Sequence, residues 1–266
     1  MGPRRIICLT EESTEWLYLL GEEDRIVGIS GYTVRPRQAR LEKPRVSSFL
    51  DGKQDKILAL KPDLVIGFSD MQASLAERLI RAGLNVWITN QRSLEEIFQT
   101  LAMLASLVGA QDRASRWIDT CRENHESIRE QASAAGPSLR GYFEEWDEPM
   151  ISAIRWVSEL MAIAGAKDVF EEKSHQSLGK DRIIHEPDAV VEANPQIIFG
   201  SWCGKKFRPE RLRARAGWQA VDAVRHQQLF EIKSSEILQP GPAALTDGLW
   251  RMHERIRTAK MYYQTL

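Results

Sequence analysis

Two segments of this chain, residues 55–67 and 188–200, share one order of features and align without a gap. Each starts with an aspartate, continues through a short apolar helix, and has a proline two residues before an apolar strand that ends in glycine. A repeated supersecondary unit indicates a repeated architecture, although this connection also occurs by chance in α/β proteins. We therefore expect two similar lobes. Both glycines, Gly67 and Gly200, would let the backbone turn or approach a ligand closely.

Short apolar runs alternate with helical patterns in the first part of the chain. We expect strands at residues 5–9, 25–30, 64–67 and 86–88, and helices at 13–20, 57–60 and 73–82. This alternation is typical of α/β layers built on a parallel sheet.

The middle of the chain contains no strand candidate between residues 93 and 134. Apolar residues recur there at helical spacing up to Gly109, and a long, highly polar helix follows from about residue 112. Strand signals resume at 141–143. The expected fold class is α/β: two Rossmann-like lobes with parallel sheets, joined by one long rigid backbone helix, with a ligand cleft between the lobes. The expected domains are an N-terminal lobe at 1–110, the helix at 111–136 and a C-terminal lobe at 137–266.

Composition excludes several classes of protein. Of the 266 residues, 43% are hydrophobic and 27% are charged, which is the ordinary range for a globular chain and not that of a disordered or collagenous one. The net charge of -1 shows no basic excess, so we expect no nucleic-acid partner. The three cysteines give no disulfide framework and no zinc spacing.

No run approaches a membrane span, and the apolar run after Arg5 is too short for a signal peptide. Location is left open between the cytoplasm and export with a leader removed.

No catalytic constellation is present in the sequence, so we expect no enzyme and no catalytic cofactor. It has no nucleophile elbow, phosphate-binding loop or dinucleotide glycine pattern. We expect His125, on the polar helix, to be solvated, whereas His175 and His185 could reach a ligand-bound metal. The acidic residues at 144–148 are either a solvated loop, a site for cationic or amide groups of a ligand, or an acid–base or cation site. The basic run at 205–215 is either a solvated helix face or a site for an anionic ligand or partner.

Several segments resemble the helical-backbone (class III) substrate-binding proteins of ABC importers, most closely the branch that binds cobalamin and iron-siderophores. The matching segments lie at residues 5–15, 25–29 and 44–49, at 55–67, where Ile-Leu-Ala-Leu-Lys-Pro-Asp-Leu-Val-Ile is close to a family signature, and after Asn194. The resemblance covers nearly the whole chain. It implies two α/β lobes bridged by one helix, which agrees with the pattern above.

The resemblance also implies ligand-binding residues on both lobes. By position these are Tyr32, Phe49, Phe68, Trp146, Trp156, Trp202 and Gln239. A large rigid ligand gains from aromatic burial at about 25 cal/mol per Å² before binding costs. Any single ring is still more often part of a core than of a ligand wall. Cobalamin binders carry Trp where this chain has Phe49 and Phe68.

The resemblance further implies a transport partner. One carboxylate on each lobe docks onto the permease subunits, and Asp55 and Asp188 occupy those positions, where helix N-capping is the structural alternative. The expected function is therefore a substrate-binding protein that holds a large metal complex for an ABC importer. Cobalamin or another corrinoid is favoured, and an iron-siderophore or haem comes next. The alternative is a cytoplasmic ligand-binding or sensor protein on the same scaffold, without a transporter. We expect a monomer.

Overall fold

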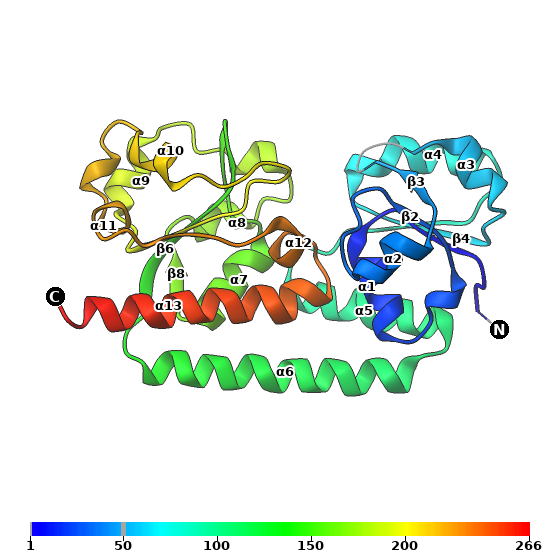
Figure 1. Cartoon of the computed structure of the whole chain (residues 1–266), viewed down its shortest axis with the longest axis horizontal. Helices are drawn as coiled ribbons and strands as arrows, with labels where there is room; N and C mark the ends of the chain where they lie inside the picture. The colour runs from blue at the N-terminus through cyan, green and yellow to red at the C-terminus, as the bar shows by residue number, and fades with distance from the viewer. Residues whose placement is uncertain (1, 49–51) are drawn as a thin grey trace. The chain divides into compact units, whose positions relative to one another are not determined.

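The computed structural model describes residues 2–48 and 52–266, and residue contacts divide the chain into two compact units. Unit 1 contains Met1–Gln91, Glu95–Asp119 and Gln239–Pro242; unit 2 contains Arg92–Leu94, Thr120–Leu238 and Ala243–Leu266. Figure 1 shows the helices and strands along the chain, coloured from blue to red. The expected boundaries at residues 110 and 136 stay a prediction.

Unit 1 is built on a parallel sheet with the strand order β3-β2-β1-β4-β5. The strands are β1 Ile6–Cys8, β2 Ile26–Ser30, β3 Arg45–Ser47, β4 Leu64–Phe68 and β5 Val86–Thr89. The bare apolar sequences of β1 and β4 fit this arrangement, because strands buried on both faces carry no alternating polar residues. In a parallel sheet all carboxyl ends lie at one edge, and ligands of open α/β sheets bind there.

The helices of unit 1 follow its strands. They are α1 Glu11–Leu19, α2 Arg37–Glu42, α3 Gln54–Ala59, α4 Ala73–Arg81 and α5 Leu94–Val108. Helix α1 begins two residues earlier than the sequence predicts, with Glu11 and Glu12 in its first turn, where the helix dipole favours negative charge. The apolar residues Ile7, Val65 and Leu79 form part of one buried cluster between sheet and helices.

Unit 2 has a mixed sheet with the order β10-β9-β6-β7, in which β8 also pairs with β6. The strands are β6 Leu139–Asp147, β7 Met150–Ser152, β8 Ala166–Asp168, β9 Ile197–Gly200 and β10 Leu229–Glu231. All pairs are parallel except β6 with β7, which form a hairpin. Two α/β lobes with mainly parallel sheets are therefore confirmed, and the hairpin is the departure from a purely parallel sheet.

The helices of unit 2 enclose a second core. They are α7 Arg155–Ala164, α8 Glu171–Ser174, α9 Asp188–Ala193, α10 Pro209–Arg213, α11 Asp222–Arg225, α12 Ser234–Ile237 and α13 Leu249–Tyr263. Tyr142, Ile198 and Trp218 are fully buried members of the core cluster on this sheet. Tyr142 and Trp218 meet edge to face, with ring centroids 6.2 Å apart.

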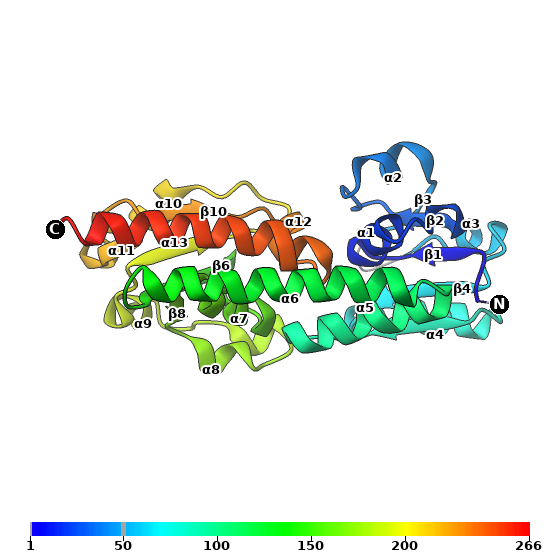
Figure 2. The same ribbon diagram turned by 90° about the horizontal axis from the view of Figure 1, so that it is seen from below.

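The long polar helix α6, Gln111–Ala134, is one continuous helix in both views (Figures 1 and 2). Its buried positions are Ala114, Cys121, His125 and Ala132, which form one narrow stripe at helical spacing. The expectation that His125 is solvated is wrong: the side chain is 6% exposed, and its Nε2 lies 2.8 Å from the carbonyl oxygen of Leu245. None of the helices in the described ranges combines the length and the apolar character needed to cross a membrane.

The sequence repeat corresponds to a structural repeat, because α3 leads into β4 and α9 leads into β9. The role expected for the two glycines is wrong. Neither adopts a positive φ, and side chains of this chain fill the space beside them. A Cβ on Gly67 would collide with the Gln72 amide, and one on Gly200 with the Phe207 ring. These positions need glycine because of internal packing.

Candidate functional site

The carboxyl edge of the unit 1 sheet carries two of the expected aromatic residues. Phe68 ends β4 and is 7% exposed, whereas Tyr32, just after β2, is 63% exposed. The Gln72 side chain ties this edge together: its oxygen accepts from the Phe68 amide at 3.0 Å, and its nitrogen donates to the Leu9 carbonyl at 3.4 Å. Met71, which follows in the next turn, is 47% exposed. The edge therefore presents apolar surface next to a hydrogen-bonded turn.

An open hollow of about 540 Å³ lies where β4 and β5 end. It is lined by Ser69, Asp70, Ile88 and Asn90 from the strand ends, together with residues of α4. Ser69 has a φ of 63°, a conformation that few non-glycine residues adopt. Strained backbone of this kind is frequent at binding sites, so the turn after β4 is part of the candidate site.

Three buried glutamates at the start of α1 were missed by sequence reasoning. Glu11, Glu12 and Glu15 are between 4% and 7% exposed. Burial raises the pKa of Glu11 to about 8 and that of Glu12 to about 7. Glu15 instead pairs with Arg35, whose Nε lies 2.9 Å from its Oε1. The acidic pattern at residues 11–15 was visible in the sequence, but nothing in it indicated burial.

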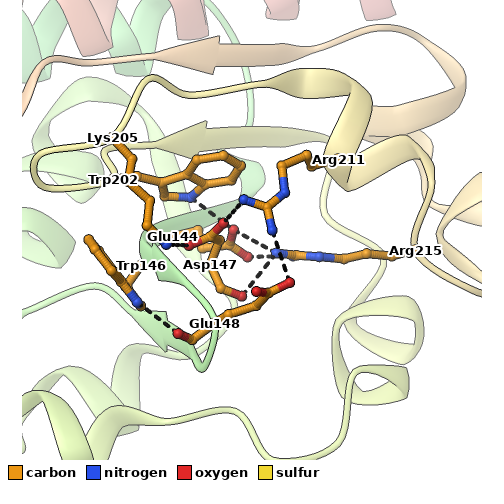
Figure 3. A network of polar contacts seen from close by, with 8 residues as sticks. All are labelled: Glu144, Trp146, Asp147, Glu148, Trp202, Lys205, Arg211 and Arg215. Atoms are coloured by element: carbon orange, nitrogen blue, oxygen red, sulfur yellow. Dashed lines mark hydrogen bonds and ion pairs between the residues drawn. The ribbon is translucent and has the colours of Figure 1, made fainter.

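At the carboxyl edge of the unit 2 sheet, Glu144 is 0% exposed and forms a complete set of charge-assisted bonds (Figure 3). Arg215 donates to both carboxylate oxygens, at 2.6 and 3.0 Å. The Tyr142 hydroxyl and the Trp202 indole nitrogen each donate at 3.0 Å. Burial alone would lower the pKa of Arg215, but the bonds and the charge of Glu144 outweigh it and raise the pKa. This pair forms the buried part of the site.

A second group of charges surrounds Asp147, the last residue of β6. Its side chain accepts from Lys205 Nζ at 2.9 Å and lies 2.5 Å from Arg211 Nη1. Burial would raise the pKa of Asp147, but these two cations hold it below its usual value. The other end of the Arg211 guanidinium reaches the exposed Glu148 at 2.9 Å. Lys205 Nζ also lies 4.0 Å from the centre of the Trp146 ring, within the range of a cation–π contact.

Three of the acidic residues at 144–148 therefore bind the basic run at 205–215, whereas Glu145 pairs with Arg182 at 2.6 Å. The prediction of a solvated loop is wrong for Glu144 and Asp147, because both side chains are buried. The prediction of a solvated helix face is wrong for Arg215, which is half-buried. Their opposite charges were the one signal in the sequence that could have suggested the pairing. Because internal cations already bind these two acids, they are not open for a cationic ligand.

The three tryptophans expected to bind ligand lie in different environments. Trp146 and Trp202 belong to the same network (Figure 3); Trp146 is half-buried, and Trp202 is 3% exposed against Phe207. Trp156 is 2% exposed, and its indole nitrogen donates to the Ile237 carbonyl at 2.9 Å, so it is part of the core. Phe49 lies outside the described residues. Ligand contact by any of these rings stays a prediction.

Gln239 begins the short segment Gln239–Pro242, which belongs to unit 1. The segment reaches the start of α1, because a Cβ on Gly241 would collide with the Cβ of Glu12. Gln91, after β5, donates to the Pro240 carbonyl at 3.1 Å. Gln239 is half-buried near the carboxyl edge of the unit 1 sheet, which is compatible with the role predicted for it.

The two aspartates predicted to dock on a transporter, Asp55 and Asp188, are both exposed and lie in the first turns of α3 and α9. The capping alternative is wrong for both, because the N-cap residues are Lys53 and Pro187. Each aspartate still stabilises its helix, because its negative charge interacts favourably with the positive end of the helix dipole. Among the described residues, no group of three or more His, Cys, Asp or Glu side chains is arranged to hold a metal ion.

Two α/β lobes with polar and aromatic residues at the strand ends define a ligand-binding protein. The sequence model of the family described as periplasmic binding protein matches residues 6–236. The chain therefore belongs to the periplasmic binding protein family, which confirms the resemblance found in the sequence. Members of this family bind substrates and are not enzymes, as the sequence predicts.

Individual relatives agree with this assignment. The uncharacterized ABC transporter substrate-binding lipoprotein YvrC of Bacillus subtilis is 22% identical over 96% of this chain and 80% of its own length. The vitamin B12-binding protein of Vibrio cholerae is 26% identical over 91% of this chain and 85% of its own length. The crystal structure of a possible iron-binding, periplasmic solute-binding protein from Staphylococcus epidermidis superposes with a TM-score of 0.81 at 20% identity, over 96% of this chain and 99% of that one. This last likeness shows the fold.

Proposed function

We propose that this protein binds one large metal complex through groups at the carboxyl edges of its two sheets and delivers it to an ABC importer. A corrinoid is the first candidate, and an iron-siderophore or haem is the next. One observation carries the proposal: both edges present aromatic surface, with Tyr32 exposed in unit 1 and Trp146 half-buried in unit 2. A flat, rigid ligand gains most from such rings, since they lose little side-chain entropy on binding.

The preference for a corrinoid over the other two ligands follows from the named relatives and from the aromatic residue at position 68. The Vibrio cholerae relative is named as a vitamin B12-binding protein, which supports the corrinoid. Phe68, where the sequence resemblance implies Trp in a cobalamin binder, is an apolar residue at the end of β4. The ring therefore still offers an apolar contact, but it has no indole N–H to donate to a side-chain amide.

The proposal that an ABC importer is the partner rests on the family of this chain and on its two exposed aspartates. Asp55 and Asp188 occupy equivalent places in the structural repeat, each in the first turn of the helix before a parallel strand. Exposed carboxylates of this kind suit arginine side chains on a partner. The YvrC relative is named as an ABC transporter substrate-binding lipoprotein, which supports this partner.

The test is a fluorescence titration of the purified protein with cyanocobalamin, haem and a ferric siderophore. We expect saturable quenching by one of them at micromolar concentration or below. W146A should weaken that binding at least about tenfold, since burying a large apolar side chain contributes about 1.5 to 3 kcal/mol. The matched control is W250A, because Trp250 lies on α13 and is 54% exposed; it should bind like wild type. Equal affinity of W146A and W250A would refute the role of Trp146, and no saturation with any ligand would refute the function.

A further inference from the structure

The charged network of unit 2 separates buried acids from exposed cations. The side chains of Glu144 and Asp147 are 0% and 1% exposed, whereas those of Lys205 and Arg211 are 40% and 41% exposed. Glu148 is the exposed carboxylate of the network, at 76%. The two cations are therefore partly exposed next to the carboxyl end of β6, which is part of the proposed binding edge. Figure 3 shows their contacts with Asp147 and Glu148.

The unused hydrogen-bonding capacity of this surface is almost all donor. Lys205 has three N–H groups and uses one on Asp147. Arg211 has five and directs one nitrogen to Asp147 and another to Glu148. The remaining N–H donors of Lys205 and Arg211 do not bond to Asp147, because its carboxylate already accepts from both cations. An incoming group that satisfies them has to bring acceptor oxygens.

The Glu148 carboxylate pairs with one of these donors, but the side chain is exposed and burial does not hold it there. Its contact is a single ion pair of 2.9 Å to Arg211 Nη2. Exposed ion pairs contribute about 0 to 1 kcal/mol, because water and salt screen them. An anionic oxygen carried by a ligand that is already bound can therefore displace Glu148 at little cost, and the Arg211–Asp147 contact below it keeps the guanidinium in place.

Resting on the function proposed above, we propose that Lys205 and Arg211 form an anion subsite. It takes a carboxylate or phosphate group on the periphery of the ligand, while the flat body of the ligand lies against Trp146. Glu148 binds the same donors when no anion is present. This makes charge at the ligand edge a specificity determinant of unit 2.

Pairs of ligands that differ in the number of carboxylate charges at their periphery test the subsite, by one charge in the first pair and by two in the second. The first pair is cyanocobalamin and its monocarboxylate, in which one side-chain amide is hydrolysed; the second is haem and its dimethyl ester. We expect the wild-type protein to bind the anionic member up to about fivefold more tightly, the size of one exposed charge pair. K205Q and R211Q should each abolish this preference, and E148Q should increase it. Each single variant leaves Asp147 with one of its two cations, so the fold is retained.

The matched controls are K206Q and R213Q, because both residues are exposed and lie in the same segment. They should keep the wild-type preference, which separates a local subsite from a general effect of positive charge. Equal affinity of the wild type for both members of a bound pair, or an unchanged preference in K205Q and R211Q, overturns the subsite and leaves the proposed function intact. Absence of binding by every member of both pairs overturns the proposed function and the subsite with it.

Discussion

Replacing Arg215 with glutamine tests whether the buried half of the unit 2 network holds the site together. R215Q removes two bonds, of 2.6 and 3.0 Å, from a carboxylate that is 0% exposed. Breaking a buried ion pair from one side costs about 3 to 5 kcal/mol, because a charge is left without compensation. Glu144 keeps its bonds from Tyr142 and Trp202, so we expect a loss near the lower value, about 3 kcal/mol.

Urea denaturation followed by far-ultraviolet circular dichroism measures this loss. The matched control is R225Q in the same unit, whose ion pair with Asp222 is 3.7 Å long and half exposed; it should change the free energy of unfolding by less than about 1 kcal/mol. Adding E144Q to R215Q should recover part of the loss, since a neutral amide needs no opposite charge. A loss in R215Q no larger than that in R225Q would refute the reasoning.

Three further predictions concern other parts of the molecule. Burial raises the folded pKa of Glu12 from 4.5 to about 7, so the folded chain binds more protons than the unfolded chain between these values. Glu12 alone should lower the free energy of unfolding by up to about 3 kcal/mol from pH 4.5 to above 7. Thermal unfolding of E12Q across this range should therefore show a weaker dependence, and the part that remains comes from groups such as Glu11, whose pKa burial raises to about 8. G200A should lower the free energy of unfolding by about 1 to 3 kcal/mol, because a Cβ there collides with the Phe207 ring; urea denaturation measures it. D55K/D188K should bind ligand like wild type but no longer stimulate the ATPase of the importer in proteoliposomes.

Each of these predictions can fail in a specific way. An E12Q variant with the same pH dependence as wild type would mean that Glu12 is not the titrating group. Wild-type stability in G200A would mean that Phe207 moves aside without cost. Loss of ligand affinity in D55K/D188K would place the aspartates in the binding site and not on the transporter surface.

The fold could be predicted from the sequence where a single local signal was decisive. The strands β1 and β4 are uninterrupted apolar runs, and Pro62 before β4 separates helix from strand. The short strands β8 and β10 gave no such signal, since each has only three residues. They form because β6 and β9 provide partners for their backbone groups.

The site was harder to predict because its contacts join distant parts of the chain. Asp147 and Lys205 are 58 residues apart, and no periodicity links a hairpin to a loop. His125 shows the same limit: the residues around it are polar, and its contact with the Leu245 carbonyl joins residues that are 120 positions apart. The ligand-binding role of the aromatic residues stays a prediction, and the sequence could not separate the buried Trp156 from the half-buried Trp146.

Native mass spectrometry of the protein mixed with equimolar cyanocobalamin, haem and a ferric siderophore tests the central claim most directly. It reports mass, stoichiometry and ligand identity in one measurement. The account predicts a single adduct of one protein with one metal complex, which W146A weakens and W250A does not. A spectrum that contains only the unliganded protein at ligand concentrations well above micromolar would contradict the account.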